Sequence, residues 1–453
     1  MFSEFIQAKN GDFYANGKKT MLRGFSIGSW MDIESFMLRI PGTEKRIRQA
    51  FTDAYGKENA ERFFDDFLNY FIAEDDFILL KSLGINVLRL PFDYRHFEND
   101  QKPGKLIYEG FKHLDRVLDL CSKYGIYAIL DLHSSPGGQN PDSHGGGDTG
   151  VSGFWEDAAA RERIINLWGH IAKRYKDDKV IAGFDILNEP CYIADLDAFN
   201  DFYDRVIEKI REMDPNHIIF LEGDDWAKDF SVFRRLGGHQ QAISFHFYPG
   251  QHVYMSLGQE ERKAELEKKL SYFTELREKT GMPLWVGETG GNFPKDKFEE
   301  GLKLVKDCLD ILEKHGISWT IWTYKDAGAM GMVYPKEAAR WTAMANEFRL
   351  QWQYKGRSNP TIAAEIFELL EEKYAYTIAE DLKERLKFRV FALLNELHVN
   401  QFVKPKLLSV SWEEMKEYPK SFLLENCDGS EELAGLVKSY TIFPDNGEVS
   451  NNA

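Results

Sequence analysis

Short apolar runs alternate with amphipathic stretches of helical period from Met21 to about Leu350. Parallel strands joined by helices produce this alternation. Eight runs qualify as strands, and most lack polar alternation, as expected for strands covered on both faces. They are Leu22–Gly28, Asn86–Leu90, Tyr127–His133, Val180–Asn188, Ile218–Glu222, Ala242–His246, Leu284–Glu288 and Trp319–Trp322. Eight such units that close on themselves predict an α/β fold, the (β/α)8 TIM barrel.

Helical stretches lie between these strands, namely Ala60–Leu83, Leu114–Tyr124, Ala158–Tyr175, Phe199–Met213, Glu260–Thr280 and Lys297–His315. Asn16 and Gly17 separate two short extended runs, so we expect a hairpin at the bottom of the barrel. After about residue 350 the alternation stops, and Thr361–Lys373 and Ile378–Leu397 have helical patterns. The sequence therefore predicts a barrel over residues 1–350 and a helical C-terminal extension over residues 351–453, packed against it.

The charge and composition of the chain limit the kinds of partner that it can bind. The chain carries 57 Lys and Arg against 73 Asp and Glu, a net charge of -16, which disfavours a nucleic acid partner. The first ten residues, MFSEFIQAKN, lack the features of a secretory signal. No segment is long and apolar enough to cross a bilayer, so we expect no membrane partner. Four widely spaced cysteines favour reduced thiols. We expect a cytoplasmic protein; a trimmed signal would leave the same sequence, and the oligomeric state is unknown.

Polar residues gather where the predicted strands end, which is where barrel enzymes place their working groups. In chain order they are Arg89, His133, Asn188, Glu189, Glu222, His246, Tyr248, Glu288 and Trp322. Glu189 and Glu288 each end an apolar strand, the fourth and the seventh. Hydrolysis of an acetal needs such a pair, because one carboxyl protonates the departing oxygen while the other attacks or stabilises the anomeric carbon. A gap of about 5 Å between them would permit covalent attack with retention.

The set Arg89, His133, Asn188-Glu189-Pro190, His246-x-Tyr248, Glu288 and Trp322 resembles, in content and order, the motifs of glycoside hydrolase family 5. The resemblance extends in layout over roughly residues 1 to 345. It implies that Glu189 is the acid/base and Glu288 the nucleophile, with Tyr248 donating a hydrogen bond to Glu288. It also implies that Arg89 lowers the pKa of Glu288, and that Glu189, near this anion, has a raised pKa.

Other site roles follow from the same resemblance. Asn188 would bond the 2-hydroxyl of the sugar, His133 and His246 would position the sugar and Glu189, and Trp322 would form the floor of the -1 subsite. The alternative for the two glutamates is a structural ion pair at a strand end. Arg89 has the alternative of a barrel salt bridge, which is compatible with a bond to Glu288.

Further candidates lie in the loops. Trp30, Trp155, Trp226 and Trp285 are aromatic residues near the top of the barrel, although Trp285 lies within a strand and suits packing. His144, with Asp142, is a candidate substrate contact or loop anchor. The spacing of Asp and His in this loop fits no compact zinc motif, so we expect no metal and no cofactor. For Glu222, both a sugar contact and a structural role stay open.

The substrate follows less directly, because the family contains endoglucanases, mannanases, β-glucosidases and β-mannosidases. Residues 24–36 are similar to a subgroup of intracellular exo-acting β-mannosidases. Long inserts at Asp32–Asn59 and Ser134–Phe154 would wall off the cleft. These features favour a carbohydrate partner and an exo-acting β-glycosidase, of β-mannosidase or β-glucosidase type, on short oligosaccharides or small β-glycosides. An endo-β-1,4-glucanase or mannanase with an open cleft, and a non-catalytic carbohydrate-binding barrel, are the alternatives.

Overall fold

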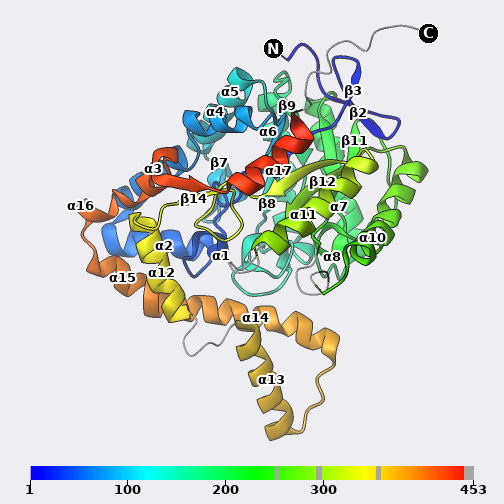
Figure 1. The fold of residues 1–453 in the computed structure, drawn as a ribbon. Coiled ribbons are helices and arrows are strands. Elements are labelled where there is room, and N and C mark those ends of the chain that lie inside the picture. The colour runs from blue at the N-terminus through cyan, green and yellow to red at the C-terminus, as the bar shows by residue number, and fades with distance from the viewer. Residues whose placement is uncertain (1, 250–253, 255, 292–297, 353–358, 443–453) are drawn as a thin grey trace, which may run out of the picture.

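Eight parallel strands form a closed barrel in the computed structural model, which describes residues 2–249, 254, 256–291, 298–352 and 359–442. Neighbours around the barrel follow one another in the chain, and every predicted strand is present, so the predicted TIM barrel is confirmed (Figure 1). The strands are β4 (Arg23–Ser26), β5 (Val87–Asp93), β8 (Tyr127–Ser134), β9 (Ile181–Asp185), β10 (Ile218–Leu221), β11 (Gln241–His246), β12 (Leu284–Gly290) and β13 (Ser318–Trp322).

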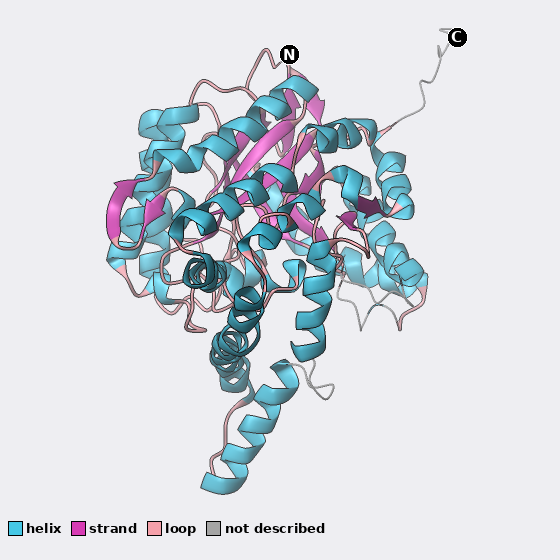
Figure 2. Ribbon diagram, turned by 90° about the vertical axis from the view of Figure 1, so that its left-hand side faces the viewer, coloured by secondary structure: helices cyan, strands magenta, loops and turns pink. Residues whose placement is uncertain are grey.

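Helices cover the outside of the barrel (Figure 2). They are α3 (Lys57–Phe71), α4 (Glu74–Ser82), α5 (Phe111–Tyr124), α6 (Ala158–Tyr175), α7 (Leu196–Met213), α10 (Gln259–Thr280), α11 (Phe298–Lys314) and α12 (Arg340–Trp352). The prediction of a single helix over Ala60–Leu83 is wrong, because the helix is interrupted between α3 and α4. Ile72 is extended there, and the Asp76 carboxylate accepts the Ala73 N–H at 2.8 Å, starting a new helix.

The end of the barrel at which its strands begin is sealed by an antiparallel sheet of β1 (Gln7–Lys9), β2 (Asp12–Ala15) and β3 (Lys18–Thr20). This end is the bottom of the barrel, although Figure 1 draws it at the top. Asn16 and Gly17 form the predicted tight turn, with φ of 50° and 73°. Phe13 of β2 is buried against Phe220, with the ring centroids 6.0 Å apart, in a cluster that includes Trp285. This apolar plug leaves the opposite end of the barrel for chemistry.

Two inserts and the C-terminal extension surround that opposite end. The insert after β4 holds α1 (Ser35–Leu38) and α2 (Glu44–Tyr55), and the insert after β8 is mostly loop. The extension forms α13 (Asn359–Tyr374), α14 (Glu380–His398), α15 (Lys404–Ser409), α16 (Trp412–Met415), β15 (Cys427–Gly429) and α17 (Glu431–Thr441). In Figure 1, α14 lies across the lower side of the barrel and α13 projects from it.

The extension returns to the body of the protein after α14. β15 pairs antiparallel with β14 (Val333–Pro335), and Phe422 packs on Phe67, Phe71 and Trp341 with ring centroids 4.8 to 5.3 Å apart. The extension is therefore mainly helical and packs on the helices around the barrel. A domain boundary at residue 350 stays a prediction.

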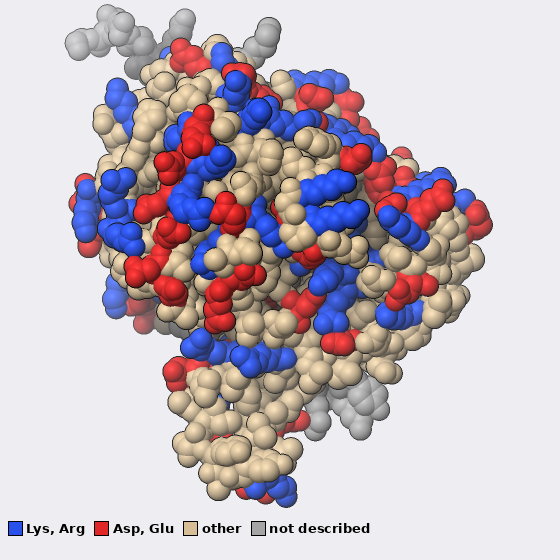
Figure 3. All heavy atoms as spheres, turned by 180° about the vertical axis from the view of Figure 1, so that it is seen from behind, with Lys and Arg blue, Asp and Glu red and all other residues tan. Residues whose placement is uncertain are grey.

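The exterior shows no single dominant charge on the face drawn in Figure 3, where basic and acidic side chains are interleaved. Among the described helices, none combines the length and the apolar character needed to cross a bilayer. All four cysteines are free, as expected, and Cys121, Cys191 and Cys308 are buried.

Candidate active site

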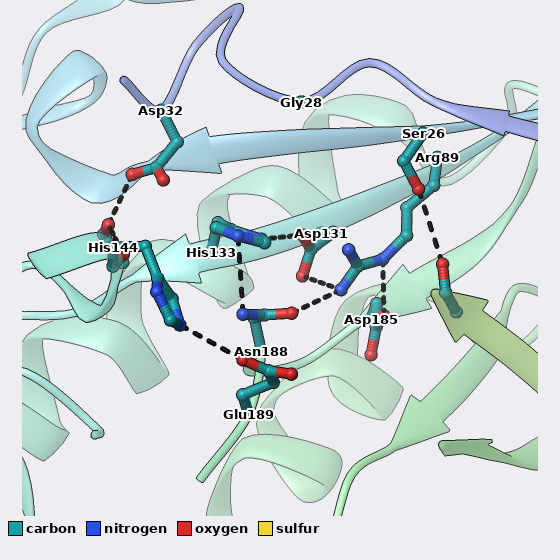
Figure 4. A network of polar contacts seen from close by, with 12 residues as sticks. Ser26, Gly28, Asp32, Arg89, Asp131, His133, His144, Asp185, Asn188 and Glu189 are labelled. Atoms are coloured by element: carbon teal, nitrogen blue, oxygen red, sulfur yellow. Dashed lines mark hydrogen bonds and ion pairs between the residues drawn. The ribbon is translucent and has the colours of Figure 1, made fainter. Parts of the chain in front are cut away.

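Arg89, near the centre of β5, organises the network of polar side chains at the carboxyl ends of the barrel strands (Figure 4). Its guanidinium is fully buried and reaches Glu288 Oε1 at 2.8 Å, Asn188 Oδ1 at 2.7 Å and Asp131 Oδ1 at 3.1 Å. Asp185 lies 3.2 Å away. Burial lowers the pKa of Arg89, but the surrounding carboxylates raise it well above its usual value. The arginine is thus a fixed cation with a rigid fork of donors.

Glu288, at the end of β12, lies between two donors. Arg89 contacts one oxygen, and the Tyr248 hydroxyl donates to the other at 2.8 Å. Only 7% of the Glu288 side chain is exposed. Burial raises the pKa of Glu288, and the charges of His246 and Arg89 offset this only in part, so the pKa stays above its usual value.

Glu189 follows β9 with a left-handed backbone, φ 47°, and its N–H donates to Glu222 Oε2 at 2.7 Å. One carboxylate oxygen lies 2.6 Å from His246 Nδ1 and the other 3.1 Å from His144 Nε2. Burial raises the pKa of Glu189, but these two imidazoles outweigh it and hold the pKa well below its usual range.

Both pKa directions are therefore opposite to the sequence-based expectation, in which Glu189 was raised and Glu288 lowered. Burial is the cause of the raised pKa of Glu288, although His246 lies 3.6 Å away and opposes it. The lowered pKa of Glu189 comes from His246, 2.6 Å away, together with His144. Burial lowers the pKa of His246, but Glu288, Glu222 and Glu189 raise it well above its usual value. The short bond between Glu189 and His246 makes the two groups titrate as one unit.

The two glutamates are close enough for joint action on one atom. A carboxylate oxygen of Glu189, one of Glu288 and a ring nitrogen of His246 all lie within 4.8 Å of one another. An approach this close of one oxygen from each carboxylate favours a retaining enzyme, in which the carboxyl groups lie about 5 Å apart, over an inverting one, in which about 6.5 Å or more leaves room for a water.

Asn188, His133 and Trp322 form the neighbouring part of the site. Asn188 Nδ2 lies 3.4 Å from His133 Nε2, and His133 Nδ1 bonds Asp131 at 2.7 Å. The rings of His133 and Trp322 are parallel, with centroids 5.2 Å apart. Trp322 also rests on Gly28, where an added Cβ would lie 2.6 Å from the indole. These three residues lie together beside Arg89 and the glutamates, and their roles towards a sugar stay predictions.

Some sequence-based assignments change. Trp30 is not a substrate contact, because it is 1% exposed and its indole N–H donates to the Leu68 carbonyl at 2.9 Å, which places it in the core. Trp155 and Trp285 are likewise buried. Glu222 is fully buried under Glu189 and accepts from Ser244 at 2.9 Å, so its role is structural.

His144 has a contact that was not expected, because its ring bonds Glu189. Its carbonyl also accepts from Ser134 Oγ at 2.6 Å, in keeping with a loop anchor, and a contact with the substrate stays a prediction. Burial alone would lower the pKa of His144, but the bond to Glu189 and the carboxylates of Asp142 and Glu34 raise the pKa to about 9.

Glu34 was missed by sequence reasoning. It lies in the insert after β4, 3.5 Å from His133 Nε2, with 7% of its side chain exposed. No hydrogen bond to its carboxylate is present within the part of the chain that the structure describes, apart from this contact with His133. The sequence around Glu34 does not indicate that its side chain faces the site, because the residue that it contacts there, His133, lies on another element, β8.

Acidic and imidazole side chains that could hold a cation occur in three groups among the described residues, and two of these groups contain site residues. Glu189, His246 and Glu288 form one of them, but their oxygens and nitrogens already bond one another, Arg89 and Tyr248. The expectation of a reaction without a metal stays a prediction.

Comparison with known proteins identifies the family. A family model described as Cellulase (glycosyl hydrolase family 5) matches residues 52–328. A beta-xylosidase of Phanerodontia chrysosporium is 36% identical over 447 residues, covering 91% of this chain and 93% of that protein. Endoglucanase C of Acetivibrio thermocellus is 26% identical, covering 58% and 87%.

Among solved structures, endoglucanase Cel5A of Thermotoga maritima superposes with a TM-score of 0.51 at 20% identity, over 69% of this chain and 91% of that one, which supports the fold. The family match covers more than half of the chain and falls on the barrel that carries Arg89, Glu189 and Glu288. The chain belongs to glycoside hydrolase family 5 and is a glycoside hydrolase.

Proposed function

We propose that this enzyme is a retaining, exo-acting β-glycosidase that removes one terminal sugar from short oligosaccharides or small β-glycosides. The observation that carries the retaining mechanism is the approach of Glu189 and Glu288 to within 4.8 Å through one oxygen each. Glu288 attacks the anomeric carbon as the bond to the leaving oxygen breaks, and Glu189 gives its proton to that oxygen. Water then releases the sugar from Glu288 and returns a proton to Glu189.

The contacts of the substrate-free site support the proton assignments. His246, 2.6 Å from Glu189, passes its proton along this bond as negative charge develops on the leaving oxygen. Arg89 and Tyr248 hold the Glu288 carboxylate in one orientation for attack. Once Glu288 carries the sugar it is neutral, so the pKa of Glu189 falls further and its carboxylate acts as base towards water.

Exo action is supported by the walls around the site. In the insert after β4, Thr43 bonds Asp148 of the insert after β8 at 2.5 Å, and Arg46 reaches both Asp148 and Glu396 of α14. Two inserts and the extension are thus tied together beside the barrel mouth, which favours a pocket over an open cleft. Exposure of the catalytic carboxylates is accordingly low, at 14% for Glu189 and 7% for Glu288.

Glu34 supplies a contact for a terminal sugar. A nearly buried carboxylate whose one described partner is His133, 3.5 Å away, keeps capacity for further donors, and sugar hydroxyls would supply them. Glu34→Gln should lower kcat/KM by about tenfold to a hundredfold, the value of one or two charge-assisted hydrogen bonds. Asp53→Asn in the same insert is the control: Asp53 lies in α2, is 45% exposed and bonds Gln49 and Lys404, so kcat/KM should not change.

Two of the similar proteins indicate which sugars to test as substrates. A beta-xylosidase matches 91% of this chain, whereas an endoglucanase matches 58%, which favours a small β-glycoside as substrate. A screen of aryl β-mannoside, β-glucoside, β-galactoside and β-xyloside, followed by the matching disaccharides, identifies the sugar. Cytoplasmic location stays a prediction from the sequence.

Two outcomes separate the alternatives. Monosaccharide released from the first minutes supports exo action, whereas a rapid fall in the viscosity of a soluble β-glucan or β-mannan supports an endo-acting enzyme. Azide should rescue Glu189→Ala and give a β-glycosyl azide, while an α-glycosyl azide would show inversion. Inactivity on every glycoside would favour a non-catalytic sugar-binding barrel.

A further inference from the structure

Helix α14 carries a row of leucines on a face that is open to solvent. Leu382, Leu386, Leu393 and Leu397 recur at helical spacing with Arg389 between them, so these side chains lie on one side of the helix. Leu382 is 45% exposed, Leu393 53% and Leu397 46%. Exposed apolar residues gathered in one row indicate an interaction surface, whereas single ones do not. We call this row the leucine stripe.

The other sides of α14 are already occupied. On one side, Phe388 is 7% exposed, and a Cβ at Gly150 would lie 2.3 Å from the Phe388 carbonyl oxygen, so the helix is seated closely on the barrel. On another side, Lys383 bonds Glu371 of α13 at 3.1 Å. At about 3.6 residues per turn, both contacts fall outside the leucine stripe, which is therefore a third face of the helix.

A groove of about 350 Å³ runs beside the leucine stripe. Leu382 and Leu386 line it on the helix side, and Pro141 and Val151 of the insert after β8 line the opposite side. The apolar surface thus continues from α14 onto the body of the barrel. A helix that packs on the stripe can also contact this second wall.

The order of the leucines is the same in both directions along α14, with its midpoint between Arg389 and Val390. Consider two α14 helices packed antiparallel and related by a twofold axis at this midpoint. Leu382 then faces the partner's Leu397, and Leu386 faces the partner's Leu393. A twofold contact requires such a surface, because the same patch on both copies must fit itself.

The charges beside the stripe suit the same antiparallel pairing. Arg385 and Glu396 lie along one edge of the stripe, near opposite ends of the helix. The Arg385 guanidinium lies 5.4 Å from the centre of the Tyr192 ring and makes no ion pair with another residue that the structure describes. Glu396 is 49% exposed. Antiparallel pairing places each Arg385 next to the partner's Glu396. Arg389 meets the partner's Arg389 at the axis, which costs free energy and keeps the pairing weak.

We propose that this chain forms a symmetric dimer, in which the leucine stripe of α14 packs antiparallel on the leucine stripe of a second copy. A contact made mainly by one helix from each copy lies at the small end of specific interfaces, which bury roughly 1,200–2,000 Å² in total. The dimer is therefore weak and reversible, with a Kd of about 1 to 100 μM.

Sedimentation velocity of the full-length protein from about 1 to 100 μM tests the dimer. The mean mass should rise from that of one chain towards that of two. Leu393→Glu should stay a single chain throughout. Arg389→Leu should lower the Kd at least about tenfold, because it removes the like charges and completes the apolar row. Ile78→Glu is the matched control: Ile78 is 54% exposed on α4, away from the stripe, so the Kd should not change (Figure 1).

Disulfide cross-linking tests the register, with the wild type as background. In Arg389→Cys the two new thiols lie next to the twofold axis, so the oxidised protein should run as a covalent dimer. In Leu382→Cys they lie about 22 Å apart along the helix axis, at about 1.5 Å per residue, so it should not. A wild type that stays a single chain at every concentration, or a Leu393→Glu variant that dimerises equally, would overturn the inference. Cross-linking in Leu382→Cys but not in Arg389→Cys would overturn the antiparallel pairing.

Discussion

Arg89 places a single positive charge among four carboxylates in a region that water does not reach. Asp131, Asp185, Glu222 and Glu288 all lie within 3.5 Å of its guanidinium. The sequence suggested only the contact with Glu288, through the family resemblance, because the other three come from different strands whose register is not readable locally. Such a network is costly to break, since each remaining carboxylate would be buried without its counter-charge.

Arg89→Met should therefore lower the free energy of unfolding by about 3–5 kcal/mol, the cost of leaving buried charges uncompensated. Urea denaturation of both proteins at neutral pH measures this difference. Arg89→Lys keeps the charge but loses the fork of donors, so it should recover part of the stability. A loss below about 1 kcal/mol in Arg89→Met would show that the carboxylates are neutralised in another way.

His144 provides a pH-dependent test at the same scale. Removing its charge in His144→Gln should raise the pKa of Glu189 and move the alkaline limb of the kcat/KM profile to higher pH. The pKa of His144, about 9, lies above its unfolded value of 6.5, so the stability that it confers is fully present below pH 6.5 and lost as the pH rises through 9. An alkaline limb that stays in place or moves to lower pH would contradict this assignment.

The histidines also show where sequence reasoning fails for single residues. The residue types at the strand ends were predictable, because apolar strands and the family motifs mark them. Their pKa directions were not, because His144 and His246 approach Glu189 from a loop and a strand 45 and 57 residues away in the chain.

At the scale of elements, the eight strands were predictable because strands buried on both faces are continuous apolar runs. The break between α3 and α4 was missed, although Glu74-Asp75-Asp76 carries the acidic first turn typical of a helix start. The contacts between the two inserts were not predictable, since they depend on side chains far apart in sequence, such as Thr43 and Asp148.

Glu44, at the start of α2, anchors the first insert and gives an element-scale prediction. Burial raises its pKa, but Arg48 and His96 outweigh this and lower it to about 2 from 4.5. Glu44→Gln should cost about 3 kcal/mol at neutral pH. A depressed pKa gives stability that is present above pH 4.5 and lost as the pH falls through 2, so the difference between the two proteins should shrink on acidification. Chemical denaturation at pH 7 and pH 3 measures it; equal differences at both would contradict the prediction.

At the scale of the whole molecule, the extension is integrated with the barrel. Its helical character was predictable from residues 361–397. The pairing of β15, the position of α17 and the packing of Phe422 were not, because they depend on residues in the barrel region. The ring of Phe422 contacts Phe67, Phe71 and Trp341. Replacing one buried phenylalanine by alanine lowers the free energy of unfolding by about 3–5 kcal/mol.

A chain ending at residue 352 should consequently lose cooperative unfolding, because it exposes the apolar surface that Phe422, Leu407 and Val437 cover. Calorimetry of the truncated and full-length proteins tests this. Phe422→Ala serves as the milder companion variant, with a lower midpoint but a cooperative transition. A truncated protein that melts at the full-length temperature would show that the barrel is independent of the extension.

Covalent chemistry at Glu288 is the central claim, and trapping the intermediate tests it most directly. The 2-deoxy-2-fluoro β-glycosyl fluoride of the preferred sugar should inactivate the enzyme and add one fluorosugar to the peptide that contains residues 284–290. Mass spectrometry of the digested protein should place this adduct on Glu288. An adduct on another residue, or hydrolysis of the reagent without any adduct together with an α-configured product, would contradict the double displacement.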